Sequence, residues 1–154
     1  AELPRFVELL EILGDWLWSR GIKQWEPGSN RADTCRLARY LASGHLLLAT
    51  CDSELAGGCI VTCEPTEEWA FAPGPSAYLH KLAVARQWAG GGLGSKLIER
   101  AVELTHERKL LRLRLDCWDG NDVLRAYYRR NGFSELDAVQ SHDYMVRLFE
   151  RQAE

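Results

Sequence analysis

The sequence lacks several features that would assign a protein to a large class at once. No apolar run approaches the ~18 residues that a membrane-spanning helix needs, and no secretory signal is visible. No Cys-x-x-Cys pair occurs among the five cysteines, and no repeat or low-complexity segment divides the 154 residues. These absences predict a single domain, soluble and cytoplasmic, whose cysteines are buried thiols. A metal pair of Cys59 and Cys63 is conceivable, but no histidine lies at ligand spacing and we expect no metal.

An excess of basic charge is also missing. The 19 basic and 22 acidic residues give a formal net charge of −3, which argues against binding nucleic acid through bulk charge. Apolar residues make up 46% of the chain, enough for one sizeable core. We therefore expect neither a nucleic-acid nor a membrane partner.

Hydrophobic periodicity predicts a mixed α/β chain built around a central sheet. Four segments have helical spacing, and the third places on one face Leu93, Leu97, Ala101 and Leu104. Several others have the composition of strands. Strict alternation in residues 110–118 places on one, buried side Leu111, Leu113, Leu115 and Cys117, and alternation in residues 78–84 places on one face Tyr78, His80, Leu82 and Val84. The predicted helices cover 3–21, 29–44 (capped by Asn30), 93–108 and 121–132, and the predicted strands cover 45–51, 56–64, 78–84, 110–118, 133–139 and 143–150, with 66–71 as an optional further strand.

A glycine-rich loop, Gly90–Gly92 followed by Gly94, lies between a predicted strand and a predicted helix. Glycines allow a phosphate to approach the backbone, and the first N–H groups of a helix have no intrahelical partner. The segment does not match a Walker A motif, because Ser95 rather than a glycine precedes Lys96. It does not match the dinucleotide-binding fingerprint G-x-G-x-x-G either. The loop alone leaves two interpretations open, a phosphate site and a plain turn.

Two motifs resolve this choice. "YLHKLAVARQWAGGGLGSKLIERA" and then "LDCWDGNDVLRAYYRRNGF" resemble the GNAT family, the Gcn5-related N-acetyltransferases, over residues 77–133. Gly92 and Gly94 fill the glycine positions of the first motif, although its Arg/Gln position falls on Ala89. Asn121, Tyr128 and the Gly-Phe pair at 132–133 fill the second motif.

The resemblance implies one GNAT domain over residues 1–154, with a central splayed mixed sheet flanked by helices. The first edge strand of the family is not evident, and an open sheet edge would favour a homodimer. Acetyl-CoA is implied as the acetyl donor. Its pyrophosphate is expected on Gly90, Gly91, Gly92, Leu93, Gly94 and Ser95, its pantetheine arm on Leu82, Ala83 and Val84, and further contacts at Asn121 and Tyr128.

The resemblance also implies catalytic roles. Tyr128 matches the tyrosine that protonates the departing CoA sulfur, although packing beside Tyr127 is the alternative. His80 is the candidate for removing the proton of the ammonium group, since an imidazole titrates near neutral pH. Glu64, Glu68 or water are the other candidates for this base.

Acceptor recognition is assigned to the segment between the first two helices. Trp25 would form an aromatic wall, with packing in the core as its alternative, and Glu26 would pair with an ammonium group. The predicted function is N-acetyltransfer from acetyl-CoA to a primary amine, that of a small molecule rather than a protein, by direct attack in a ternary complex. Acetylation of a protein N-terminus or lysine, and a noncatalytic CoA-binding module, are the alternatives.

Overall fold

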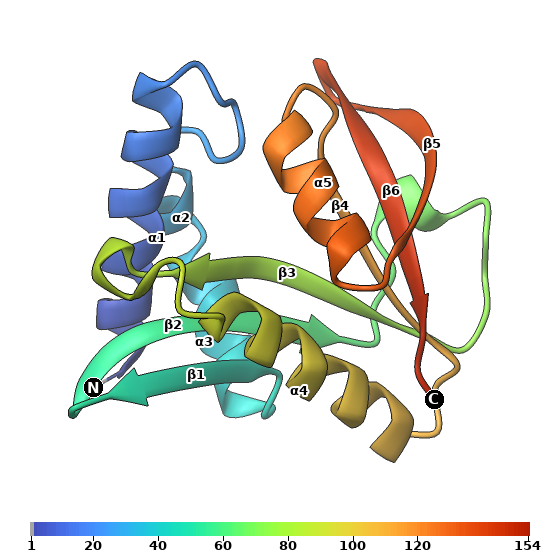
Figure 1. The fold of residues 1–154 in the computed structure, drawn as a ribbon, viewed down its shortest axis with the longest axis horizontal. Coiled ribbons are helices and arrows are strands. Elements are labelled where there is room, and N and C mark those ends of the chain that lie inside the picture. Colours follow the sequence, from blue (N-terminus) through green and yellow to red (C-terminus); the bar gives the residue numbers. More distant parts are fainter. Residues whose placement is uncertain (1) are drawn as a thin grey trace. The chain divides into compact units, whose positions relative to one another are not determined.

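The computed structural model describes residues 2–154, and the chain divides into two compact units. The first contains the chain up to Val61 together with His80–Leu97, and the second contains Thr62–Leu79 and Ile98–Glu154. Figure 1 labels the principal elements. In chain order they are α1 (Glu2–Ser19), α2 (Ser29–Ala32), α3 (Thr34–Ala42), β1 (Leu46–Cys51), β2 (Glu54–Thr62), η1 (Glu67–Trp69), β3 (Ser76–Val84), η2 (Arg86–Trp88), α4 (Leu93–Glu107), β4 (Arg112–Trp118), α5 (Asp122–Arg130), β5 (Ser134–Ser141) and β6 (Tyr144–Gln152).

The first unit packs α1 and α3 around the β1–β2 hairpin. Asp52 and Ser53 close this hairpin with φ of 50° and 66°, the left-handed values that a two-residue turn requires. Apolar side chains of α1 form its core with others from α3, β2 and β3. This core contains Phe6, Val7, Leu9, Leu10, Leu13, Leu37, Ile60 and Ala83.

The second unit contains the hairpin of β5 and β6, with β4 beside β6. Trp69, Tyr78, Val146 and Leu148 form a buried cluster there. The alternation predicted for residues 110–118 is present, because Leu113, Leu115 and Cys117 are all buried. Leu111 lies outside β4 and is exposed, so its predicted place on the buried face was wrong.

The strands form a mixed sheet with the hydrogen-bonded order β1-β2-β3-β4-β6-β5. β3 and β4 are parallel over the pairs from Ser76–Arg112 to Tyr78–Arg114, whereas the β1–β2, β4–β6 and β5–β6 pairs are antiparallel. β1 and β5 are the edge strands. This topology confirms the predicted fold class.

Two predicted elements differ from the structure. Residues 66–71 contain the 3-10 helix η1 rather than a strand, because the indole of Trp69 is buried in the second unit's cluster. The predicted helix 29–44 is two helices that break at Asp33, and Asn30 does not cap the first, since Gly28 occupies the N-cap. The side chain of Asn30 instead accepts a hydrogen bond from Lys81.

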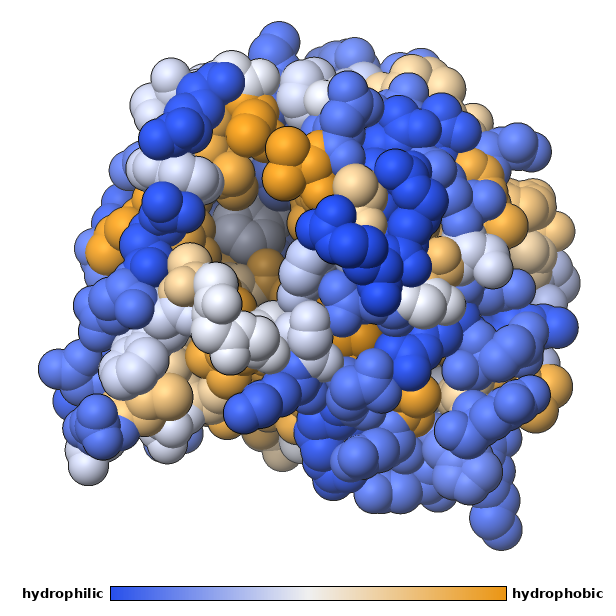
Figure 2. Space-filling view, in the orientation of Figure 1, coloured by the Kyte–Doolittle hydropathy of each residue, from blue (hydrophilic) through white to orange (hydrophobic). Residues whose placement is uncertain are grey.

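Hydrophilic side chains cover most of the face drawn in Figure 2, with smaller groups of apolar ones between them. Among residues 2–154, no helix combines the length and the apolar character that a membrane crossing requires. Cys59 and Cys117 are buried as predicted, and burial raises the pKa of each thiol to about 12. The prediction was wrong for Cys35 and Cys63, which are exposed, so Cys59 and Cys63 do not share one environment.

Candidate functional site

The glycine-rich loop lies in the first unit between η2 and α4 (Figure 1). Gly90 and Gly92 both have φ of 81°, and a Cβ built on either would meet no atom within 4 Å. The N–H of Lys96 donates to the carbonyl of Gly92 (3.1 Å), so the N–H groups of residues 93–95 precede the helical ladder of the 15-residue α4. Open backbone and helix N–H groups with a partial positive charge form a geometry that accepts a phosphate.

Contacts within the first unit fix the entrance to this loop. The guanidinium of Arg86 lies 3.9 Å from the ring centroid of Trp16 in α1. Gln87 Nε2 donates to Glu54 Oε2 of β2 (3.0 Å). The indole Nε1 of Trp88, just before the loop, is buried without a hydrogen-bond partner among residues 2–154. A phosphate oxygen would satisfy such a donor.

β2 lies unusually close to the segment of β3 assigned to pantetheine, Leu82–Val84. A Cβ on Gly57 would lie 2.6 Å from the carbonyl oxygen of Ala83, a contact that no side chain tolerates. The N–H of Ala85 donates to the carbonyl of Ala56 (2.8 Å). Glycine at position 57 therefore sets the position of this part of β3.

Lys81 interrupts β3 with a φ of 53°. This left-handed conformation costs about 1–2 kcal/mol in a residue with a Cβ. A single such residue disrupts the pleat, so the alternation predicted for residues 78–84 is interrupted after the half-buried His80. The sequence contains no signal for this kink, because lysine does not favour positive φ.

The two predicted substrate residues lie in the first unit. Trp25 is half-buried and packs against the core of that unit, and the ammonium Nζ of Lys81 lies 5.5 Å from its ring centroid. Glu26 is exposed, and its carboxylate forms no ion pair or hydrogen bond with residues 2–154. That carboxylate is therefore chemically able to pair with an ammonium group.

Asn121 lies just before α5 and Tyr128 lies on it, both in the second unit. Asn121 Oδ1 accepts a hydrogen bond from the N–H of Leu124 (3.1 Å) and thereby caps α5. The side chain of Tyr128 is only 6% exposed, and its ring lies 5.8 Å from that of Phe133 and 5.4 Å from that of Phe149 between centroids. Packing thus fixes the direction of the phenol, and its contact with CoA stays a prediction.

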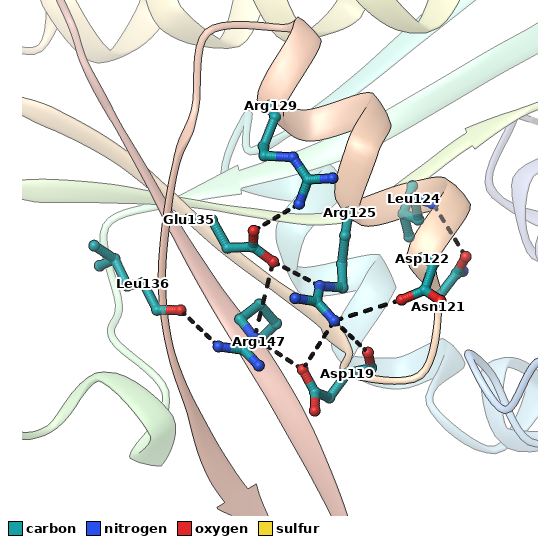
Figure 3. Close-up of polar contacts among 9 residues, drawn as sticks. All are labelled: Asp119, Asn121, Asp122, Leu124, Arg125, Arg129, Glu135, Leu136 and Arg147. Carbon is teal, nitrogen blue, oxygen red and sulfur yellow. Dashed lines mark hydrogen bonds and ion pairs between the residues drawn. The ribbon is translucent and has the colours of Figure 1, made fainter.

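An ion-pair network holds the start of α5 against β5 and β6 (Figure 3). Glu135 accepts hydrogen bonds from Arg125 Nε and an Nη of Arg129, both at 2.6 Å. Asp119 accepts one from Arg147 Nε (2.8 Å). Burial alone would raise the pKa of Glu135, but the hydrogen bonds from these two arginines outweigh it and the pKa is lowered. The network positions the loop that carries Asn121.

A titratable carboxyl group that the sequence prediction missed is Asp116 of β4. Burial, with a smaller contribution from Glu68, raises its pKa to about 6, and no hydrogen bond or ion pair reaches it from residues 2–154. At Glu68, burial is outweighed by hydrogen bonds such as that from Ser141, and its pKa is lowered. Glu64 is exposed. The alternation of β4 contains a usable signal, since it places Asp116 on the face opposite the buried leucines.

We expect the Asp116→Asn substitution to change how stability depends on pH. The folded-state pKa of about 6 exceeds the ordinary aspartate value of 3.8, so the folded state binds the proton more tightly. The free energy of unfolding should therefore fall as pH rises from about 4 to 6, on the order of 2–3 kcal/mol, and Asp116→Asn should remove this fall. Urea titrations across this range measure it. Asp137→Asn, at an exposed position, should keep the wild-type profile.

Structures with this fold include acetyltransferases from several bacteria. A GNAT-family acetyltransferase from Listeria monocytogenes 4b F2365 superposes with a TM-score of 0.72 and 23% identity, covering 98% of this chain and 89% of the other. One from Elizabethkingia anophelis, solved with acetyl-CoA bound, gives a TM-score of 0.60 and 17% identity over 76% of this chain and 81% of the other. At these identities the likeness concerns the fold.

The sequence comparisons assign the family. Residues 10–133 match the model of the "Acetyltransferase (GNAT) family". The chain is also 33% identical over 149 residues to the "Uncharacterized N-acetyltransferase YesJ" of Bacillus subtilis (strain 168), covering 94% of this chain and 81% of that protein. The chain belongs to the GNAT family of acetyltransferases, which confirms the resemblance drawn from its two motifs and makes it an acyltransferase.

Proposed function

We propose that this enzyme transfers the acetyl group of acetyl-CoA to a primary amine of a small molecule, by direct attack in a ternary complex. The observation that carries the proposal is the loop in which Gly90 and Gly92 adopt positive φ beside open space, immediately before α4. Membership of the GNAT family supports acetyl transfer from acetyl-CoA.

In this proposal each part of the donor has its own contact. The N–H groups of Gly90–Ser95 hold the pyrophosphate, with the orphan indole donor of Trp88 beside them. The main chain of Leu82–Val84 pairs with the amide groups of pantetheine, as an added strand would. Asn121 contacts the CoA arm while its side chain caps α5.

The chemical step forms a carbon–nitrogen bond, breaks a carbon–sulfur bond, removes two protons from the nitrogen and adds one to the sulfur. His80 removes a proton from the acceptor ammonium, and the neutral nitrogen attacks the thioester carbonyl carbon. The tetrahedral intermediate collapses by breaking the carbon–sulfur bond, and Tyr128 donates its hydroxyl proton to the departing thiolate. The second proton lost by the nitrogen returns to the Tyr128 phenolate and restores the phenol, while the proton on His80 is released to water. The products are an N-acetyl amide and CoA, with one proton released overall.

Trp25 and Glu26 are proposed to contact the acceptor, with the free carboxylate of Glu26 as partner of its ammonium group before deprotonation. Acetylation of a protein N-terminus or lysine remains the second candidate in the same chemical class. Within residues 2–154, β1 is an edge strand that pairs with β2 alone, which supports a homodimer formed by strand addition at that edge.

We expect His80→Ala to flatten or shift the acidic limb of the pH–rate profile of kcat/KM, because the base would lose its ionisation near neutral pH. Stopped assays between about pH 5.5 and 9 measure it, with acetyl-CoA saturating. The same assay on Asp116→Asn identifies the alternative base, because that carboxyl titrates at about 6. An unchanged His80→Ala profile would assign the proton to Asp116 or to water.

A screen of amines and peptides tests the function itself. CoA release is recorded with a thiol reagent and corrected for acetyl-CoA hydrolysis, and the acetylated products are identified by mass spectrometry. Acetylation of small amines supports the proposal, whereas acetylation of peptides alone supports the protein-directed alternative. Retention on immobilised CoA without turnover of any acceptor would indicate a noncatalytic CoA-binding module.

A further inference from the structure

A buried polar cluster in the first unit contains a donor group, the Nδ2 of Asn30, that no atom of residues 2–154 uses. The ammonium of Lys81 on β3 donates to Asn30 Oδ1 (2.7 Å) and lies over the ring of Trp25 at 5.5 Å. The side chain of Asn30 is 1% exposed, and its Nδ2 has no hydrogen-bond partner among residues 2–154. We propose that Lys81 and Asn30 form a binding site for a carboxylate group of the acceptor, so that the amine is an amino acid or a related amino-carboxylic acid.

The orientation of the amide follows from its partner. A lysine ammonium only donates hydrogen bonds, so the Asn30 atom that faces it must be the oxygen. The orphan group is therefore an N–H₂ donor. An unsatisfied buried donor is unfavourable, and an oxygen atom of a ligand would satisfy it.

Lys81 forms no ion pair with any carboxylate of residues 2–154. Glu11, which is 2% exposed, accepts hydrogen bonds from the N–H groups of Gly28 and Arg31, both at 2.9 Å. Its carboxylate is thus committed to the segment that carries Asn30. Burial lowers the pKa of Lys81, while the charges of Asp33 and Glu11 partly oppose this and that of Arg36 adds to it. A ligand carboxylate would compensate the buried ammonium directly.

The donor set distinguishes a carboxylate from other ligands. An ammonium group beside Lys81 would meet a like charge and an N–H₂ donor, both repulsive. A carboxylate presents two oxygens, one for Lys81 Nζ and one for Asn30 Nδ2. The ammonium group of the acceptor would then bind at a different position from its carboxylate. That the ligand of this site is the acceptor rests on the proposed function.

A ligand can reach the cluster from the side on which Lys81 is exposed to solvent. Lys81 is half-buried, so a ligand approaches from its exposed side. Gly21 and Gly28, with φ of 76° and 83°, bound the segment 22–27, which contains the half-buried Trp25 and the exposed Lys23 and Glu26. A carboxylate that contacts Lys81 Nζ from this side also lies beside the amide of Asn30, because Nζ is 2.7 Å from Asn30 Oδ1.

Wild-type enzyme gives the first test, without any substitution. Glycine, β-alanine, 4-aminobutyrate and 6-aminohexanoate are each compared with their primary amides, and the last two also with butylamine and hexylamine. For the best chain length we expect kcat/KM for the acid to exceed that for the amide by roughly ten- to hundredfold. Equal values for acid and amide at every length would overturn the inference while leaving N-acetyltransfer intact.

Two variants then test whether Lys81 and Asn30 bind the carboxylate. Lys81→Met keeps the length of the side chain without its charge, and Asn30→Asp keeps an acceptor for Lys81 but places a negative charge where the carboxylate would lie. Both should raise KM for the acid roughly ten- to hundredfold and leave KM for the amide within about twofold. Lys23→Met, at an exposed lysine of the same segment, is the matched control. A loss that is equal for acid and amide, or a weakened Kd for CoA, would contradict an acceptor-carboxylate site.

Calorimetric titration with 6-aminohexanoate in the presence of CoA separates this inference from the proposed function. If wild-type enzyme binds 6-aminohexanoate and Asn30→Asp does not, the carboxylate site is supported even when no amine is acetylated. Such binding without acetylation would overturn only the transferase proposal. Binding that neither variant weakens, or no binding of any of the four acids, overturns the carboxylate site. Far-UV circular dichroism and the thermal midpoint of each variant show whether it has folded.

Discussion

Gly92→Val is expected to lose CoA affinity by roughly a hundredfold or more, because two or more charge-assisted contacts to phosphate would be blocked. The space beside Gly92 is free of protein atoms within 4 Å, so the added side chain would occupy the volume assigned to the pyrophosphate. The φ of 81° also strains any residue with a Cβ, by about 1–2 kcal/mol. Native domains have about 5–15 kcal/mol of stability, so the variant should remain folded. Isothermal titration with CoA measures the affinity.

The chain offers a matched control for this variant. Gly44 has φ of 73° and, like Gly92, no atom within 4 Å of the position that a Cβ would take. It follows α3 and lies outside the glycine-rich loop. Gly44→Val should therefore suffer a similar loss of stability in urea titrations while its Kd for CoA stays at the wild-type value. Normal CoA affinity in Gly92→Val would contradict the assignment of the loop.

Tyr128→Phe should reduce kcat by roughly a hundredfold or more, since the thiolate would lose its proton donor. The ring is buried against Phe133 and Phe149, and phenylalanine preserves all of that packing. We therefore expect the thermal midpoint and the Kd for CoA to change little. Steady-state kinetics with saturating acetyl-CoA, alongside calorimetry, separates the loss of chemistry from any loss of binding.

Tyr127 supplies the comparison, because its ring lies 5.8 Å from that of Tyr128 and is less buried. Tyr127→Phe removes a hydroxyl from the same helix and should leave kcat within about twofold of wild type. If both variants keep full turnover, the phenol of Tyr128 serves packing only. The proton for the thiolate would then come from water or from another side chain.

The sequence predicted those elements whose pattern is local. The strict alternation before Cys117 identified β4, and the spacing of Leu97 and Ala101 identified α4, because in both cases one face is buried in a core. The segment around Trp69 has the composition of a strand, yet its indole is buried from a 3-10 helix. Burial of one large side chain outweighed the local preference, and periodicity cannot show this.

The candidate site was predictable to the extent that it depends on backbone freedom. Glycines in a motif identified the loop, and the structure adds that Gly90 and Gly92 have positive φ. The left-handed backbone of Lys81 and its hydrogen bond to Asn30 depend on tertiary contacts between residues 51 positions apart, for which no spacing rule exists. Asn30 was assigned to a helix cap for the same reason.

The close approach of Gly57 to Ala83 has a consequence for engineering this enzyme. Displacing the segment of β3 that is proposed to bind pantetheine would require β2 to move as well, because the carbonyl of Ala83 rests against a position with no side chain. Libraries that randomise residue 57 would consist largely of misfolded or displaced variants. Changes in acyl-chain preference are better sought at positions whose neighbours are side chains, which adapt by changing rotamer.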